Sequence, residues 1–251
     1  MTAGLSVYMT FAGLLMVLVL VLLARALSPE EPRRSRLLDG GVAALGTLAI
    51  ALSLTRNAYL GLAAGIVVLL LVQKPKSLFV LAPLGLAAWI AAPAEVRDRA
   101  RSTFDPADET VRDRVAMWKA GRLMIRDHPL FGVGPGRIKE VYPEYRQPGY
   151  VLPRVGHLHN NLVTTAAETG LPSAAFYLWF VGALLAGGVR RARAPGVDPA
   201  RPFTRGAVAA FVALFVAGMF EYNFGDVEIL IPTLVLSVVP WVGRSPSSGA
   251  D

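Results

Sequence analysis

The sequence predicts an all-α fold: a polytopic bundle of transmembrane helices with one long segment outside the membrane. Of the 251 residues, 54% are hydrophobic and 17% are charged, whereas soluble domains carry roughly 25% charged residues. Several apolar runs approach the ~20 residues that a helix needs to cross a bilayer. The net charge of +7 sits largely in short segments between these runs, where it sets membrane topology. We therefore expect no nucleic-acid partner.

We predict seven transmembrane spans from the apolar runs. They cover residues 5–24, 39–55, 57–72, 78–93, 171–188, 206–222 and 227–243. The spans divide the chain into three regions. Residues 1–93 hold about four spans, residues 94–170 form an outer segment with amphipathic and re-entrant helices, and residues 171–251 hold about three spans and a short cytoplasmic tail.

Basic residues predict the orientation. They follow the first, third, fifth and seventh spans, which end on the same side if the chain alternates, and the positive-inside rule makes that side cytoplasmic. The outer segment and the break at Thr55-Arg56-Asn57 then share the opposite face. The amino terminus also starts outside, so we expect further spans upstream. The basic residues are Arg25, Arg33, Arg34, Arg36, Lys74, Lys76, Arg190, Arg191, Arg193, Arg201, Arg205 and Arg244.

The sequence of the outer segment predicts an amphipathic helix over residues 105–126. Asp105 is the expected N-cap, and Pro106 suits the first helical position. Arg114 lies close to the edge of the apolar face, and Arg112 points away from it. Such a helix can lie at the membrane interface. Its predicted apolar face consists of Val111, Val115, Trp118 and Ile125.

A glycine-rich stretch follows, Gly132-Val133-Gly134-Pro135-Gly136. Gly and Pro at this density predict a turn. The alternative is a loop that offers backbone amides to a phosphate. It does not match the dinucleotide fingerprint, because Arg137 stands at the sixth position and no strand precedes it.

All three histidines, His128, His157 and His159, lie in the outer segment. The spacing of His157 and His159 does not put both rings on one helical face, and the chain has no cysteine, so we predict no metal site. Two roles remain for His159: a cap of the next helix, or a catalytic or anion-binding group. We expect His128 and His157 to be structural or peripheral.

Residues 160–169 predict a short helix, which Gly170 and Pro172 interrupt before the next span. A helix that ends and restarts at membrane depth must be buried or line a cavity. Glu168 on this helix is either a structural carboxylate or a group that orients an Arg or His. The segment from Glu221 to Asp226 joins the last two spans on the outer side, and we expect only an indirect role for it.

Several of these residues resemble the O-antigen ligases and the related O-antigen polymerases. His159-Asn160, followed after nine residues by Gly170, is similar to the signature of that family. Ser173 stands where members usually carry Gly, Thr or Tyr. Members normally have more spans, so this chain looks like a carboxy-terminal portion. Further motifs resemble the family in the same order, namely Thr55-Arg56, Arg114-Val-Ala-Met-Trp118 and Asp127-His128-Pro129-Leu130-Phe131-Gly132-Val133-Gly134.

The resemblance implies a metal-independent, inverting glycosyltransferase without a cofactor, on the outer (periplasmic) face of the bacterial inner membrane. It would move a glycan from undecaprenyl diphosphate to a sugar hydroxyl of an acceptor glycolipid or glycan, among membrane lipids. His159 would be the general base, and Arg56 and Arg114 would bind the diphosphate. Further substrate-binding candidates are Arg137, Arg146, Asn160 and Glu168.

Three alternatives stay open. The acceptor is lipid A-core in a ligase and another lipid-linked repeat in a polymerase. A transporter for an anionic lipid or solute also uses intramembrane arginines and interrupted helices. A non-catalytic scaffold of an export complex is the third alternative. An enzyme is favoured over a transporter because the sequence shows no internal repeat and the candidate groups share one face.

Overall fold

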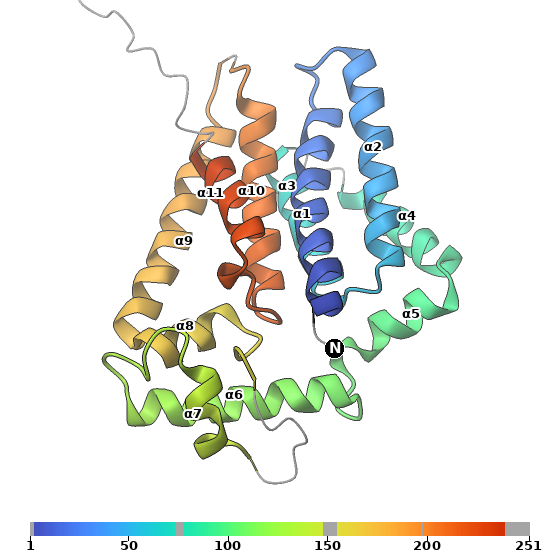
Figure 1. The fold of residues 1–251 in the computed structure, drawn as a ribbon. Coiled ribbons are helices and arrows are strands. Elements are labelled where there is room, and N and C mark those ends of the chain that lie inside the picture. The colour runs from blue at the N-terminus through green and yellow to red at the C-terminus, as the bar shows by residue number, and fades with distance from the viewer. Residues whose placement is uncertain (1–2, 74–77, 148–154, 197, 239–251) are drawn as a thin grey trace, which may run out of the picture.

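The computed structural model describes residues 3–73, 78–147, 155–196 and 198–238. Within these ranges the chain is helical and contains no strand, which confirms the predicted all-α fold. Figure 1 shows a bundle of helices, with further helices lying across one of its ends. The bundle contains α1 (Ala3–Ala26), α2 (Arg33–Leu52), α3 (Arg56–Gln73), α9 (Leu171–Ala192), α10 (Arg201–Ala217) and α11 (Val227–Val238), with α4 (Leu78–Ala91) at its side.

Four described helices are long and apolar enough to cross a membrane: α1 over Met9–Ala26, α2, α3 and α9. Three other predicted spans coincide with α4, α10 and α11, which have 14, 17 and 12 residues. These helices are shorter than the ~20 residues of a full span. Their crossing of the membrane therefore stays a prediction. Lys74, Lys76, Arg244 and residues 239–243 lie outside the described residues.

Two helices of the bundle extend further than their apolar runs. The helix α2 begins at Arg33, directly after Pro32, and α10 begins at Arg201 with Pro202 in its first turn. Proline suits the first turn because its fixed φ matches the helix and no hydrogen bond is lost there. Both helices therefore start inside the basic segments, ahead of the predicted starts at 39 and 206.

Small residues let α3 and α10 approach closely. A Cβ atom on Gly61 would lie 2.7 Å from the Ala213 carbonyl oxygen, and one on Gly65 would lie 3.0 Å from that of Ala209. Such contacts between small residues are typical of helix packing in membranes, where close van der Waals contact drives association. The contact fixes the start of α3, and with it Arg56, beside the end of α10.

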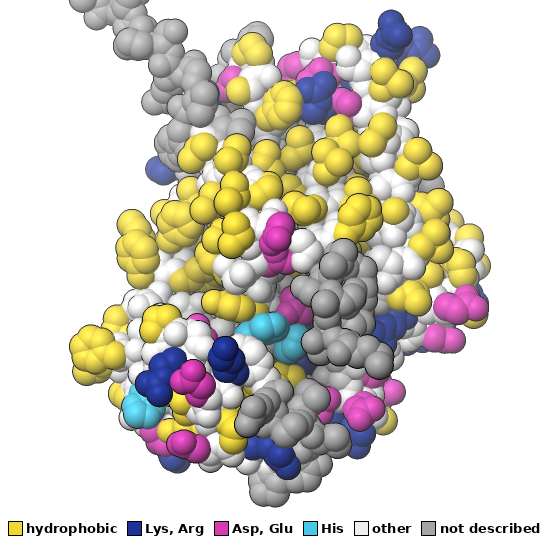
Figure 2. Space-filling view, viewed as in Figure 1, with side chains coloured by type: hydrophobic (Ala, Val, Ile, Leu, Met, Phe, Trp, Pro, Cys, Tyr) yellow, Lys and Arg dark blue, Asp and Glu magenta, His cyan; other side chains and the backbone are white. Residues whose placement is uncertain are grey.

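One end of the bundle, here called the basic end, carries the loops after α1 and after α9. Glu30 in the first loop pairs with Arg201 at 3.6 Å and with Arg205 at 3.8 Å. Arg25 bonds to Asp39 at 2.8 Å. These ion pairs place the two basic loops on the same end, as the alternating arrangement predicts. Figure 2 shows charged side chains at both ends of the molecule and an apolar belt between them.

The other end, here called the site end, carries the helices of the outer segment (Figure 1). Their packing forms a second core, in which Met117, Met124, Ile138, Tyr142 and Leu158 are buried. The elements are α5 (Ala94–Arg101), η2 (Ser102–Phe104), α6 (Glu109–Asp127), α7 (Ile138–Tyr145), α8 (Asn161–Thr169) and η3 (Asn223–Gly225).

The predicted start of α6 is wrong. The N-cap is Asp108, whose carboxylate accepts the Val111 amide at 3.2 Å. Asp105 instead begins a turn, in which its side chain accepts the Ala107 amide at 2.8 Å and its carbonyl accepts the Asp108 amide at 3.1 Å. Both aspartates can cap a helix, but Asp108 also pairs with Arg56, and this long-range contact favours the later start.

The residues that α6 buries are not those of its predicted apolar face. Val115 is 36% exposed, and the Trp118 indole N–H donates to the Leu158 carbonyl at 3.1 Å instead of lying free at an interface. The cause is Gly121, where a Cβ would come within 2.6 Å of Leu158 and Val163. This gap lets α6 pack tightly on the segment before α8. The buried face consists of Ala116, Met117, Ala120, Gly121 and Met124.

Candidate functional site

The start of α8 is fixed to the turn between α10 and α11. Asn160 caps the helix, because its Oδ1 accepts the Val163 amide at 2.9 Å, and its Nδ2 donates to the Met219 carbonyl at 2.9 Å. The Asn161 amide donates to the Gly218 carbonyl at 2.7 Å. A Cβ on residue 218 would lie 2.1 Å from the Asn161 side chain, so this contact requires glycine.

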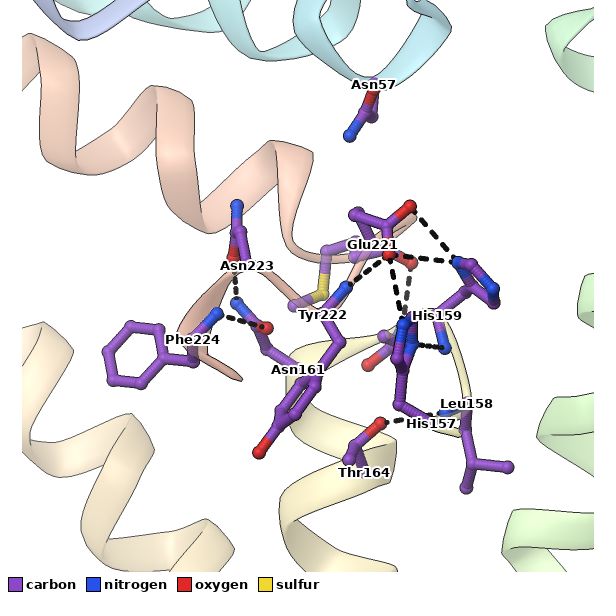
Figure 3. A network of polar contacts seen from close by, with 12 residues as sticks. Asn57, His157, Leu158, His159, Asn161, Thr164, Glu221, Tyr222, Asn223 and Phe224 are labelled. Carbon is purple, nitrogen blue, oxygen red and sulfur yellow. Dashed lines mark hydrogen bonds and ion pairs between the residues drawn. The ribbon is translucent and has the colours of Figure 1, made fainter. Parts of the chain in front are cut away.

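The Asn161 side chain extends this connection into η3, as Figure 3 shows. Its Nδ2 donates to Asn223 Oδ1 at 2.5 Å, and its Oδ1 accepts the Phe224 amide at 3.2 Å. Asn223 in turn donates to the Leu214 carbonyl at 3.1 Å. Because these amides are buried and bonded, the turn is held rigidly against α8, and Glu221 in that turn is placed beside the histidines.

The glycine-rich stretch packs against the end of α8. The Val133 amide donates to the Ala167 carbonyl at 2.8 Å, and the Gly134 amide donates to the Glu168 carbonyl at 2.9 Å. Gly132 has φ +65, and a Cβ there would lie 2.3 Å from the Glu168 carbonyl carbon. Since these amides bond to protein atoms, the stretch is the predicted turn, and the phosphate-loop alternative is not supported.

Gly170, the last residue of the signature-like pattern, has a packing role. It ends α8 with φ +88, a conformation that favours glycine. A Cβ there would lie 2.1 Å from the Leu130 carbonyl oxygen, and the next amide, that of Leu171, donates to the Pro129 carbonyl at 2.8 Å. The predicted break between α8 and α9 is confirmed.

His159 lies at the centre of a polar cluster (Figure 3). Its Nδ1 is 2.9 Å from Glu221 Oε1 and 3.1 Å from Oε2. The His157 ring centroid is 4.3 Å from that of His159, and its Nε2 is 3.9 Å from Glu221 Oε1. His159 has φ +47, in a left-handed region that non-glycine residues rarely adopt. This conformation turns both imidazoles toward one carboxylate.

The electrostatics of the cluster follow from burial and neighbouring charge. Burial opposes ionisation of Glu221, but the hydrogen bond and the charge of His159 outweigh it and lower the pKa of this carboxyl. Burial lowers the pKa of His157 to about 4, and the neighbouring His159 acts in the same direction. At neutral pH the cluster therefore holds an ionised Glu221 and a neutral His157.

Two imidazoles and a carboxylate also raise the question of a metal. Their candidate ligand atoms lie within 4.8 Å of one another. The sequence argument that the two rings lie on different helical faces does not apply, because residues 155–160 are not helical. However, His157 Nδ1 accepts the His159 backbone N–H at 3.3 Å. Its proton then sits on Nε2, the nitrogen nearer Glu221, so a metal ion at this nitrogen would have to displace that proton.

Arg56, the first residue of α3, lies at the same end and is 4% exposed. Its Nη1 donates to the Ser102 carbonyl at 2.8 Å, and its Nη2 pairs with Asp108 at 3.1 Å. Burial opposes ionisation of Asp108, but the bond to Arg56 outweighs it and lowers the pKa of this carboxyl. Arg56 thus joins α3 to the outer helices, and this pair already occupies part of its fork.

Within the described part of the chain, Arg114 on α6 has fewer hydrogen-bond partners than Arg56. Its Nε is buried and has no hydrogen-bond partner among the described residues. Burial lowers the pKa of its guanidinium, Glu221 acts against this, and the nearby Arg56 and Arg99 lower it further. Arg114 is therefore a desolvated cation near the Glu221 carboxylate and near two other cations, Arg56 and Arg99. Arg112 on the same helix is exposed, as expected.

The remaining predicted residues lie elsewhere or have structural partners. Arg137 is exposed and pairs with Glu140 at 3.2 Å, and Arg146 is exposed at the end of α7. Burial raises the pKa of Glu168, partly offset by the Gly136 amide. Among the described residues, no contact joins these three side chains to His159. Asn160 positions the helix as its cap.

Two residues, Glu221 and His157, lie closer to His159 than their positions in the sequence suggest. Glu221 is 62 residues from His159 in the chain, and no local pattern links them. The sequence predicts a structural or peripheral role for His157, because the family-like pattern includes His159 and not His157. Two features of the sequence point to these residues: the predicted outer position of the turn after α10, and the second histidine close before α8.

The fold and this site define a multi-pass membrane protein with a histidine, carboxylate and arginine cluster at one end of its helices. The sequence profile of the O-antigen ligase family matches residues 41–178, more than half of the chain, so the chain belongs to that family. The comparison with curated proteins finds no match. Membership identifies a membrane enzyme of the glycosyltransferase type, whose substrates are in general a lipid-linked glycan and an acceptor.

Proposed function

We propose that this protein transfers a glycan from undecaprenyl diphosphate to a sugar hydroxyl, with lipid A-core as the acceptor of an O-antigen ligase. The observation that carries the proposal is the geometry of His159, whose Nδ1 bonds to Glu221 while the ring remains 31% exposed. The other ring nitrogen is thereby available to a substrate. A histidine with this arrangement suits general-base catalysis near neutral pH.

The reaction is a direct displacement at the anomeric carbon. The acceptor hydroxyl oxygen attacks that carbon and gives its proton to His159 Nε2. The bond between the anomeric carbon and the diphosphate oxygen breaks, and undecaprenyl diphosphate leaves with the bonding electrons. One displacement inverts the anomeric centre. The donor carries its own leaving group, so the residues in this mechanism require neither nucleotide nor metal.

Arg114 and Arg56 are the proposed diphosphate ligands. The guanidinium of Arg114 supports this role because its Nε lacks a partner, and arginine binds phosphate oxygens with two parallel hydrogen bonds. Arg56 would exchange Asp108 for a phosphate oxygen, or would bind through the part of its fork that the pair leaves free. Positive charge at this position stabilises the diphosphate as it leaves.

The proposed location is the bacterial inner membrane, with the site end on the periplasmic face. The basic loops at the opposite end support this orientation through the positive-inside rule. In this arrangement residues 94–170 form the outer segment that receives both substrates. Arg137 and Arg146, which are exposed there, are proposed to contact the acceptor or the more distant sugars of the donor.

The test is glycan transfer by the purified protein in lipid, with a defined undecaprenyl-diphosphate-linked donor and lipid A-core or a second lipid-linked repeat as acceptor. His159→Ala should lower turnover about 10²–10⁴-fold, the usual contribution of a general base. The control is His128→Ala, at the exposed end of α6, which should leave turnover unchanged. Full activity of His159→Ala would refute the base assignment, and transfer only to the second repeat would identify a polymerase.

A further inference from the structure

Glu221 stands where three groups converge. Its carboxylate contacts His159 Nδ1 at 2.9 Å, accepts the Tyr222 backbone N–H at 3.0 Å and lies 3.9 Å from His157 Nε2. Its side chain is 14% exposed. A carboxylate this well buried needs partners to stay ionised, and those closest to it are the two imidazoles and one amide.

The position of Glu221 depends on a rigid connection rather than on a flexible side chain alone. The turn that carries it bonds to both asparagines after His159, through the Met219 carbonyl to Asn160 and through the Gly218 carbonyl to Asn161. The base and its carboxylate therefore belong to one hydrogen-bonded unit, although α8, α9 and α10 separate them in the chain.

The chemistry of this contact determines which ring nitrogen of His159 carries the proton. An ionised carboxylate only accepts hydrogen bonds, so a short contact to it requires a proton on Nδ1. In neutral imidazole the lone pair then lies on Nε2. With the opposite tautomer, two lone pairs would face each other at Nδ1, and Nε2 could not act as a base.

We propose that Glu221 is the positioning residue of the site: its carboxylate holds His159 in the tautomer whose Nε2 accepts the proton of the acceptor hydroxyl. The inference rests on the proposed base role of His159 and adds a residue outside the family match at residues 41–178. When His159 has taken up the proton, Glu221 also stabilises the imidazolium without taking a proton itself. The proton leaves later, from Nε2 to water.

His157 has a different task in the same cluster. Its Nδ1 accepts the His159 backbone N–H, so its own proton lies on Nε2 and faces Glu221. At 3.9 Å this contact is too long for a hydrogen bond, but the oriented N–H favours the charge on the carboxylate.

The decisive measurement is ¹⁵N NMR of the histidine side chains in the full chain, reconstituted in lipid nanodiscs at neutral pH. The chain has only three histidines, so single replacements assign each signal. We expect the neutral His159 ring to carry its proton on Nδ1. A His159 ring protonated on Nε2 overturns the proposal, whatever the activity of the protein.

Transfer assays supply the second measurement. Glu221→Gln, which keeps the shape but replaces one carboxylate oxygen with an NH₂ donor and removes the charge, should lower turnover about 10²-fold or more and shift the His159 proton to Nε2. Glu221→Asp should restore part of the activity and the original tautomer. The control is Glu228→Gln, an exposed carboxylate on α11. Wild-type turnover of Glu221→Gln, while His159→Ala is inactive, would overturn the role of Glu221 and leave the base assignment intact.

Discussion

At the residue scale, the site depends on one unusual backbone conformation. His159 and Leu54 are the two non-glycine residues with positive φ in the described part of the chain, at +47 and +53. His159 is the proposed base, and Leu54 lies two positions before Arg56. A left-handed conformation costs a non-glycine residue roughly 1–3 kcal/mol. The cost is offset by the hydrogen bonds that fix each segment, and it is incurred where side chains must be aimed.

The two arginines of the site differ in what holds them. Arg56 has two protein partners, so its removal affects the fold as well as the site. The Nε of Arg114 has no hydrogen-bond partner among the described residues. Because Arg114 is largely buried, its attraction to an incoming phosphate is strong, since charge interactions strengthen where water is excluded. Arg114 is therefore the clearer probe of substrate binding.

We predict that Arg114→Ala lowers glycan transfer about 10²–10³-fold, the usual effect of removing one stabilising donor from an active site. Arg114→Lys should retain only part of the activity, because it keeps the charge and loses the fork. The matched control is Arg112→Ala on the exposed face of the same helix, with no expected effect. Equal losses in the Arg112 and Arg114 variants would contradict the assignment.

At the element scale, α8 is short but has firm support at both ends. Asn160 caps its start against the α10–α11 turn, and the glycine-rich turn covers its end through two backbone bonds. A helix of 9 residues is too short to be stable alone. Tertiary contacts therefore decide its position. Gly132 and Gly170 allow these contacts, because a side chain at either position would meet neighbouring backbone atoms.

This reasoning predicts different costs for two glycines of one turn. Gly132 and Gly136 have φ of +65 and +69, but a Cβ meets the backbone of α8 only at Gly132. Gly136→Ala should cost about 1 kcal/mol, from the left-handed conformation alone, and Gly132→Ala about 1–3 kcal/mol more. Thermal denaturation in detergent compares the two variants. Similar melting temperatures would show that the contact with α8 is not tight.

At the scale of the whole molecule, charge divides the two ends. At one end, Glu30 of the α1–α2 loop pairs with two arginines near the start of α10, and Arg56, His159 and Glu221 lie at the other end. The helices between them present exposed apolar side chains, among them Leu45, Phe176 and Trp179. Such a belt suits lipid, and it separates the site end from the basic end.

The natural absence of cysteine makes the orientation directly testable. We predict that Lys139→Cys, on the exposed surface of α7, reacts with a membrane-impermeant maleimide added to the periplasmic side of intact cells. Arg34→Cys, at the exposed start of α2, should react only after the membrane is broken. Labelling of Arg34→Cys in intact cells, with Lys139→Cys protected, would reverse the proposed orientation.

The all-helical membrane fold and the break between α8 and α9 could be predicted from the sequence alone, and local motifs in it suggest His159, Arg56 and Arg114 as candidate site residues. Apolar run length, Gly and Pro placement and local motifs carry this information within short stretches of chain. Boundaries were less certain: the N-cap of α6 went to Asp108 rather than Asp105, because an ion pair with distant Arg56 chose between two equivalent caps.

Only the tertiary structure decided how these groups meet. Glu221 reaches His159 across 62 residues because buried asparagines attach the α10–α11 turn to α8, and no sequence periodicity records such a contact. The buried face of α6 likewise followed Gly121, whose missing side chain admits Leu158, rather than the largest apolar residues. Close packing and buried hydrogen bonds are cooperative properties of several segments, so they appear only when those segments are assembled.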